Sequence, residues 1–235
     1  MQSPTIKAAW LRSHLPPRRD VFLLLIGALV VLTVLGINHL IEAARVPLQP
    51  KSSAITSPWI PATVKRWQGP IGEMAKKYDV NPDLIAIIMT LESGGYSKAN
   101  SGFAQGLMQV SPLTAKNIAA KFLKAPTKTY DIWNPRTNIE FGTAYLAYLR
   151  DQFGATDQGP SWNATVELIA AGYNGGPGAA GNLERGKGLH DMQTVVYSRD
   201  AYNMWRERHA AVSPTFDRWK ERGGYSLLNL AKAEK

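Results

Sequence analysis

The sequence contains no cysteine. That absence excludes a disulfide scaffold, a thiolate metal site, a cysteine nucleophile and a membrane anchor built on a lipid-modified cysteine. Histidine is also scarce, and its four residues are scattered, with no carboxylate at metal-ligand spacing. These residues are His14, His39, His190 and His209. We therefore expect neither a metal site nor another cofactor.

Acidic residues are outnumbered by basic ones. The 235 residues include 27 Lys and Arg against 18 Asp and Glu, which gives a formal net charge of +9 and a pI of about 9.7. Such a surface favours polyanions, among them nucleic acid, cell walls and membrane surfaces. Because the basic residues are scattered and no nucleic-acid-binding motif is present, nucleic acid is not an expected partner. The length suits one catalytic domain with an additional segment.

The longest apolar run lies near the start of the chain. Residues 21–41 would form a helix about 31 Å long, which matches the hydrocarbon thickness of a bilayer. Few charges follow the run, whereas four basic residues precede it: Lys7, Arg12, Arg18 and Arg19. The positive-inside rule makes 1–20 a cytoplasmic basic segment and places everything after the span outside the cytoplasmic membrane. A cleaved signal peptide is the alternative, which the length of the run and a poor cleavage site disfavour.

The rest of the chain divides by composition. Residues 42–63 are rich in proline and serine and predict an extended linker. A globular domain is expected over 64–210, and a tail over 211–235 adds one short helix through Trp219 before it frays. The domain has helical periodicity, no convincing strand pattern and no internal repeat. The predicted fold class is therefore mostly α, with one globular domain after the membrane helix.

Signals for helix starts recur through the domain. An Asn or Ser cap followed by proline occurs at Asn81-Pro82, Ser111-Pro112 and Asn134-Pro135. Ser161 is a further candidate cap, for a helix through Ala171. The helix after Asn134 has one apolar face, which consists of Ile139, Gly142, Leu146, Leu149 and Phe153.

Glu92 ends the most apolar of these helices. The helix begins after Asn81, and Ser93-Gly94-Gly95 stops it. Residues three, four and seven positions earlier share its face and are all apolar: Met89, Ile88 and Ile85. A carboxyl group there loses hydration, so its pKa rises, as a general acid acting on a glycosidic bond requires. A lone glutamate at a helix end is more often an ordinary carboxylate, so the assignment depends on the segments that follow.

Four such segments follow in order. They are Ser101–Pro112 (SGFAQGLMQVSP), Asn138–Leu146 (NIEFGTAYL), Ala170–Gly178 (AAGYNGGPG) and Gln193–Tyr197 (QTVVY). Together with Glu92-Ser93, they resemble the soluble-lytic-transglycosylase family of lysozyme-like enzymes, over roughly Val64–Arg208. The resemblance implies an α+β lysozyme-like fold with a groove for a sugar strand. It also implies non-hydrolytic cleavage of the peptidoglycan β-1,4 bond between N-acetylmuramic acid and N-acetylglucosamine, which leaves 1,6-anhydromuramic ends.

The resemblance assigns roles to particular residues. Glu92 corresponds to the catalytic acid and base. Tyr173 and Asn174 match a Tyr-Asn pair in which the tyrosine lies near the glutamate and the substrate. The other substrate-binding candidates are Ser101 (with Asn100 as the alternative), Gln109, Gln193 and Tyr197. The glycines around Tyr173 favour an exposed loop.

The sequence also departs from the family pattern. Phe103 stands where glycine is frequent, Ser111 where a methionine often lines the groove, and Gln193 where a glutamate usually opens the last motif. After Glu92 no acid appears until Asp131, and the one other acid within the quoted motifs, Glu140, lies on a different predicted helix. Two-carboxylate glycosidases need a second carboxylate about 5 to 9.5 Å from the first. This disfavours a goose-type lysozyme-like hydrolase.

Two further alternatives are an inactive peptidoglycan-binding scaffold and a plain membrane adaptor. Retention of Glu92, Gln109 and Tyr173 disfavours the first, and the four motifs disfavour the second. The prediction is an enzyme anchored in the inner (cytoplasmic) membrane by a single helix, with its catalytic domain on the extracytoplasmic, periplasmic side. Its partners are peptidoglycan strands and, by analogy alone, an envelope-spanning machine.

Overall fold

The computed structural model describes residues 53–123, 130–153 and 160–234. Within these ranges the secondary structure is helical, apart from isolated bridges that pair Asn100 with Gln105 and Gln105 with Val110. The elements are α3 (Ala62–Lys65), α4 (Gln68–Tyr78), α5 (Pro82–Ser93), α6 (Pro112–Ile118), η1 (Ala119–Leu123), α7 (Pro135–Phe153), α8 (Pro160–Gly175), α9 (Pro177–Glu184), α10 (Met192–Glu207), α11 (Pro214–Trp219), η3 (Lys220–Gly224) and α12 (Tyr225–Ala233). The prediction of a mostly helical domain is confirmed.

The predicted membrane helix at 21–41 lies outside the described residues, as do the segment 1–20 and the first part of the predicted linker. None of the helices in the described ranges combines the length and the apolar character that a membrane span needs. The anchor therefore stays a prediction from the sequence.

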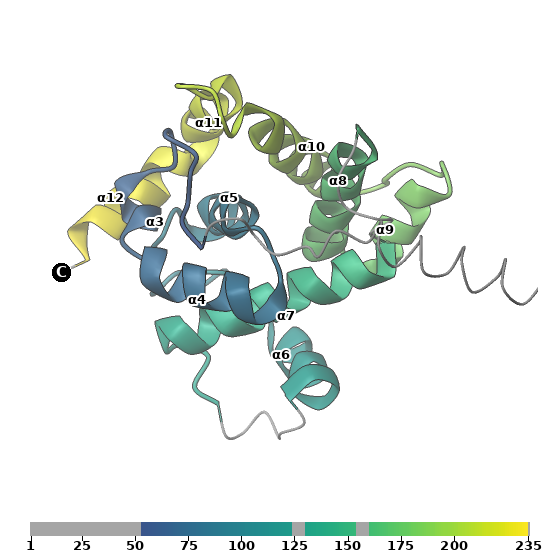
Figure 1. Cartoon of the computed structure of the whole chain (residues 1–235), viewed down its shortest axis with the longest axis horizontal. Helices are drawn as coiled ribbons and strands as arrows, with labels where there is room; N and C mark the ends of the chain where they lie inside the picture. The colour runs from purple at the N-terminus through teal and green to yellow at the C-terminus, as the bar shows by residue number, and fades with distance from the viewer. Residues whose placement is uncertain (1–52, 124–129, 154–159, 235) are drawn as a thin grey trace, which may run out of the picture. The chain divides into compact units, whose positions relative to one another are not determined.

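Helix α5 lies at the centre of the described domain (Figure 1). Every residue from Leu84 to Thr90 is buried, because the run is apolar around the whole helix. The Asn81 side chain caps the helix by accepting a hydrogen bond from the backbone N–H of Asp83 at 2.9 Å. Gly94 ends it in the left-handed conformation, with φ 61°. Since α5 contacts α3, α4, α10 and α12, much of the fold positions its last turn.

The other predicted helix starts have mixed outcomes. Ser111 caps α6, and Asn134 accepts a hydrogen bond from Thr137 N at the start of α7, as the sequence predicts. The prediction for Ser161 is wrong, because α8 begins at Pro160 and continues to Gly175, past Ala171. Gly172 lies inside this helix and packs closely on α7, because a Cβ on it would lie 2.7 Å from the Leu149 side chain.

The globular unit begins within the predicted linker. The backbone N–H groups of Thr56 and Ser57 each donate to Oδ1 of Asp83 at 2.9 Å, and the Thr56 hydroxyl donates to Oδ2 at 2.6 Å. Trp59 belongs to the core, and its Nε1 donates to the carbonyl of Glu207 at 3.0 Å. The linker prediction is therefore too long at its end, because composition does not reveal that one buried carboxylate holds this segment.

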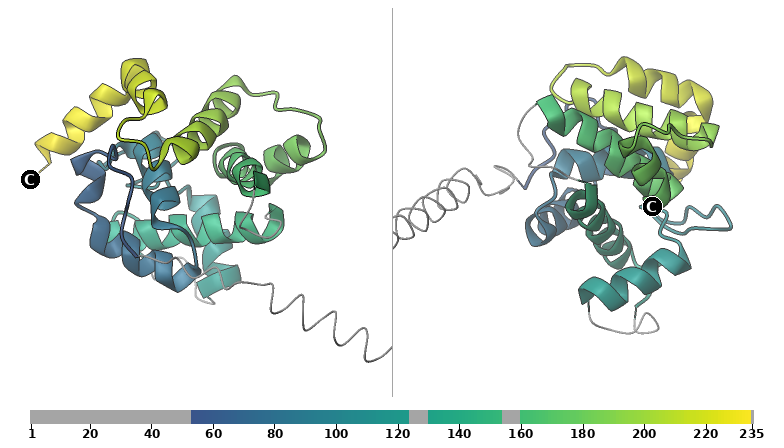
Figure 2. Two further views of the ribbon diagram at one scale, coloured as in Figure 1. Left: turned by 45° about the horizontal axis from the view of Figure 1, so that its top comes forward. Right: turned by 90° about the vertical axis from the view of Figure 1, so that its right-hand side faces the viewer.

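The tail also packs against the domain instead of fraying after Trp219. Leu228 and Ala231 of α12 are buried, and α12 (yellow) returns to lie beside α3 (blue) in Figures 1 and 2. The sequence pattern misses this continuation because the chain kinks at Arg222 and Gly223, where Gly223 adopts φ 117°. The tail thereby reaches α5 as well as α3.

We expect Asp83→Ala to lower the free energy of unfolding by about 2 to 3 kcal/mol, because it leaves the Thr56 and Ser57 N–H groups without their acceptor. Urea denaturation followed by circular dichroism measures the change. The control Asp151→Ala removes only an exposed ion pair with Arg150 and should change the value by less than about 0.5 kcal/mol. Equal values for the two variants would contradict the assigned role of Asp83.

Candidate active site

Glu92 lies in the last turn of α5. The residues that share its face, Ile85, Ile88 and Met89, are fully buried, as the sequence predicts. The Glu92 side chain is half-buried, so it loses hydration while staying within reach of a ligand. Burial raises the pKa of Glu92 from 4.5 to about 7, and a hydrogen bond from Tyr197 offsets part of that rise.

Tyr197 of α10 contacts Glu92, the candidate catalytic residue. Its hydroxyl donates to Oε1 of Glu92 at 2.6 Å. Burial, followed by the charge of Glu92, raises the pKa of Tyr197 well above its usual value. The phenol therefore stays protonated at neutral pH and holds the carboxyl in one orientation in either protonation state of the acid.

Tyr173 lies in the last turn of α8 and is half-buried, so the predicted exposed loop is wrong. Its hydroxyl donates to the carbonyl of Met108 at 2.8 Å, and its ring packs on Tyr145 with centroids 5.3 Å apart. Burial, and then the charge of Glu92, raises the pKa of Tyr173 well above its usual value. A second neutral phenol thus lies close enough to Glu92 to sense its charge.

The loop between α5 and α6 is fastened to α5 and to α7. The Ser93 hydroxyl donates to the carbonyl of Leu107 at 2.7 Å. From α7, Asn138 accepts from Met108 N at 2.7 Å and donates to Gln105 O at 2.8 Å. Gly142 of α7 permits this close approach, because a Cβ on it would lie 2.5 Å from Met108 Cβ. The loop carbonyls beside the site are therefore fixed.

Ser101 and Gln109 both bond within this loop. Ser101 is exposed, and its hydroxyl accepts from Ala104 N at 3.1 Å. Gln109 adopts φ 44°, which is uncommon outside glycine, and its Nε2 donates to Ala99 O at 3.0 Å and to Gly106 O at 2.9 Å. These contacts shape the loop, and the substrate-binding roles of both residues stay predictions.

A cleft of about 470 Å³ lies between the end of α8, the helix α9 and the start of α10. Asn174, which follows Tyr173, lines it together with Gln193 and Thr194, one turn before Tyr197. The other lining residues are Gly175, Ala179, Asn182, Leu189, His190 and Asp191. The structure therefore gathers the predicted residues into neighbouring groups: Glu92 with two tyrosines, Asn174 with Gln193 along the cleft, and Ser101 with Gln109 in the loop.

The site is built around one titratable carboxyl group. Among the described residues, burial and the hydrogen bond from Tyr197 account for the shifted pKa of Glu92, with no part played by another carboxylate. The described residues also contain no group of three His, Asp or Glu side chains that could hold a metal ion. The arrangement can donate a proton near neutral pH and take one back at the same atom.

Sequence reasoning missed three residues that build this site. Ser93 and Asn138 hold the loop, and the Tyr145 hydroxyl donates to the carbonyl of Gly172 at 3.0 Å. All three stand inside the quoted motifs. Their position was therefore a signal, although a single sequence does not separate supporting residues from substrate contacts.

The family model of the transglycosylase SLT domain matches residues 69–195, which is more than half of the chain. The chain therefore belongs to this family. The matched range begins in α4 and ends just before Tyr197. The segments before α4 and after α10 lie outside the family model.

Curated relatives include the membrane-bound lytic murein transglycosylase E of Buchnera aphidicola, 32% identical over 130 residues, which make up 54% of this chain and 58% of that protein. The membrane-bound lytic murein transglycosylase C of Actinobacillus pleuropneumoniae is 40% identical over 116 residues, 46% of this chain and 30% of the relative. This chain thus spans between about a third and three fifths of the length of these relatives.

One solved structure with similarity is an inactive mutant of the lytic transglycosylase Slt from Pseudomonas aeruginosa. It shares 26% sequence identity and covers 66% of this chain and 24% of that one, with a TM-score of 0.44. A score of this size does not establish a common overall fold.

A carboxyl group with a raised pKa should make the folded protein less stable as the pH rises. Between pH 4.5 and about 7 the unfolded chain loses the Glu92 proton while the folded chain keeps it. We expect Glu92→Gln to be more stable than the wild type at pH 8, by on the order of 3 kcal/mol, and close to it at pH 4. Denaturation at both pH values measures the difference.

Glu73→Gln serves as the control, because the Glu73 carboxyl is exposed and paired with Arg136. It should show no gain at pH 8. A gain for Glu92→Gln that is the same at both pH values would mean that desolvation of the carboxyl is not its cause.

Proposed function

We propose that this chain is a peptidoglycan lytic transglycosylase with a lysozyme-like fold. It cleaves the β-1,4 bond between N-acetylmuramic acid and N-acetylglucosamine without water. One observation carries the proposal: a single half-buried carboxyl group, Glu92, has a pKa of about 7 in a chain of the SLT family. The names of the curated relatives support the same activity.

In the first step, protonated Glu92 donates its proton to the glycosidic oxygen as the bond to the anomeric carbon breaks. A pKa of about 7 keeps a substantial fraction of the group protonated at neutral pH. Positive charge then develops on the sugar, next to the carboxylate that has just formed. The bond from Tyr197 becomes charge-assisted at that moment and so stabilises the carboxylate.

In the second step, the Glu92 carboxylate accepts the proton of the 6-hydroxyl of the muramic residue. The oxygen of that hydroxyl bonds to the anomeric carbon of the same sugar and closes the 1,6-anhydro ring. The proton count balances, because Glu92 ends protonated as it began. Among the described residues no other carboxylate contributes to the pKa shift of Glu92, and Glu140, the other carboxylate in the motifs, is paired with Lys77 and Tyr78. In this proposal no second carboxylate activates a water molecule.

The sugar strand is proposed to lie across the loop between α5 and α6 and the cleft at the ends of α8 and α10. Asn174 and Gln193 line that cleft, and their amides match the acetamido and hydroxyl groups of the sugars. The remaining predicted contacts are Ser101, Gln109, Tyr173 and Tyr197.

We expect digestion of purified peptidoglycan to release products that end in 1,6-anhydromuramic acid, detected by mass spectrometry. Glu92→Gln should lower turnover by about 10²-fold or more, because general acid and base catalysis contributes that much. The variant should still bind the polymer.

Three other results would reject the proposal. Reducing muramic ends would mean hydrolysis, as in a goose-type lysozyme. No product from the wild type would support a binding scaffold. Turnover of Glu92→Gln within tenfold of the wild type would remove Glu92 from its assigned role.

We further propose that residues 21–41 anchor the enzyme in the inner membrane as a single span, with the catalytic domain on the outer side. The names of both curated relatives include "membrane-bound", which supports association with a membrane. Orientation rests on the four basic residues that precede the span. An envelope-spanning machine stays a candidate partner by analogy.

The full chain should therefore fractionate with membranes and resist extraction by salt and carbonate. Protease added from the outer side should digest the catalytic domain. A soluble form that begins near Ala44 would indicate cleavage and reject the anchor. Protection of the domain from outside protease would reject the orientation.

A further inference from the structure

The turn after Glu92 is held more tightly than its glycines alone require. Gly94 and Gly95 both have positive φ, 61° and 86°. A Cβ on Gly95 would lie 2.2 Å from the carbonyl oxygen of Thr63, so the turn presses directly on α3. A Cβ on Gly94 would lie 3.2 Å from Leu228 of α12. The turn thus packs against α3 and α12, two helices that lie outside the range matched by the family model.

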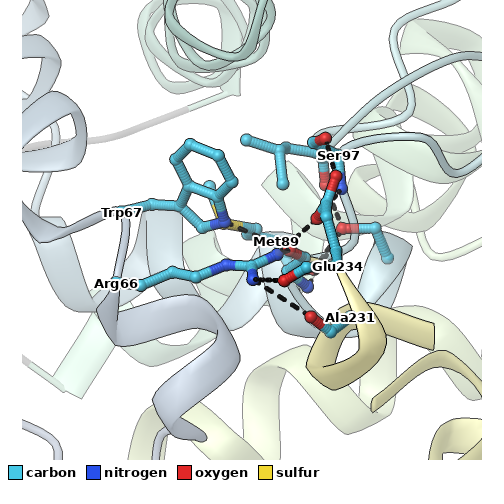
Figure 3. Close-up of polar contacts among 9 residues, drawn as sticks. Arg66, Trp67, Met89, Ser97, Ala231 and Glu234 are labelled. Carbon is cyan, nitrogen blue, oxygen red and sulfur yellow. Dashed lines mark hydrogen bonds and ion pairs between the residues drawn. The ribbon is translucent and has the colours of Figure 1, made fainter. Parts of the chain in front are cut away.

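Two side chains that follow α3 donate hydrogen bonds to one backbone carbonyl of this turn, that of Gly95. Arg66 Nη2 donates to Gly95 O at 2.8 Å, and Trp67 Nε1 donates to the same oxygen at 3.1 Å. Arg66 Nη1 also donates to the carbonyl of Ala231 in α12, at 3.0 Å. The planar guanidinium therefore joins the turn to the last helix, as Figure 3 shows.

Glu234 closes the arrangement from the other side. It forms an ion pair with Arg66 and accepts hydrogen bonds from the backbone N–H of Ser97, at 3.2 Å, and from the Ser97 hydroxyl. Burial raises the pKa of Glu234, but the Ser97 bonds and the charge of Arg66 outweigh it and hold the pKa below its usual value. The carboxylate is therefore ionised and bonded on both sides (Figure 3).

We propose that Arg66 and Glu234 form a clamp on Gly95 and Ser97 that sets the position of Glu92, which makes Glu234 a positioning residue for the lytic reaction. The proposal rests on the proposed function. The clamp has a mechanical reason: Glu92 stands at the end of α5, where a helix frays unless its following residues are held. When the turn is fixed, the Glu92 carboxyl group keeps a constant degree of burial among the apolar side chains around it.

The test compares the full chain with Glu234→Gln and Arg66→Lys. Each variant keeps the size of its side chain but loses the charge pair or the planar fork. We expect kcat to fall by roughly tenfold while KM changes by less than about twofold, because a small misplacement of the acid affects the chemical step.

The pH profile separates positioning from general support. Tyr197 bonds to Glu92, and Tyr173 lies close enough to be affected by its charge; both phenols are neutral, and the charges of Arg66 and Glu234 are paired with each other. A loosened turn admits water to the Glu92 carboxyl, so its pKa falls. The basic limb of the kcat profile should therefore move to lower pH in both variants.

Glu73→Gln is the matched control, because it breaks an ion pair between α4 and α7 that does not touch the turn. It should keep the kcat and the pH profile of the wild type. NMR titration of the Glu92 carboxyl reports the same shift without turnover, so an inactive wild type would reject the proposed function while the clamp is still tested. Unchanged kcat and pH profile in both variants would overturn the clamp. A loss of activity that only follows the loss of folded protein, with an unchanged profile, would also overturn it.

Discussion

The arrangement of the candidate active site depends on one constraint: the Glu92 carboxyl group must be poorly hydrated and yet accessible to a substrate. Glu92 meets this requirement because it belongs to α5, a helix that is buried on all sides from Leu84 to Thr90, and stands in its last turn, where the side chain is half-buried. The raised pKa of Glu92 reflects the free energy that it costs to ionise a carboxyl group in this poorly hydrated position. Such a group weakens the fold at neutral pH, as active sites often do, and the rest of the domain must compensate.

Much of the surrounding structure supplies that compensation. Tyr197 bonds to the carboxyl, Tyr173 holds the Met108 carbonyl, and Ser93 holds the neighbouring carbonyl of Leu107. The loop between α5 and α6 is thereby tied to α5 and α8, and through Asn138 to α7. Helices distant in sequence thus meet at one loop, which is why motifs scattered over a hundred residues form one site.

The sequence predicted the parts of this fold whose cause is local. Asn81 and Gly94 bound α5 because a cap and a left-handed glycine act on their own turn, and the apolar face of α7 follows from its periodicity. Predictions failed where a distant partner decides the outcome. Asp83 fixes a proline-rich segment, Gly172 of α8 packs closely on Leu149 of α7, and α12 reaches α3 past a kink.

The candidate site followed the same division. Its motifs predicted Glu92, Tyr173 and Tyr197, but neither motif nor spacing pointed to Arg66 and Glu234, whose partners in the clamp lie 29 or more positions away. Burial of its carboxyl group makes Glu92 a proton donor near neutral pH. NMR titration of its side-chain carboxyl carbon in the wild-type protein tests this most directly. We expect a pKa of about 7. A value near 4.5, the ordinary one, would contradict it.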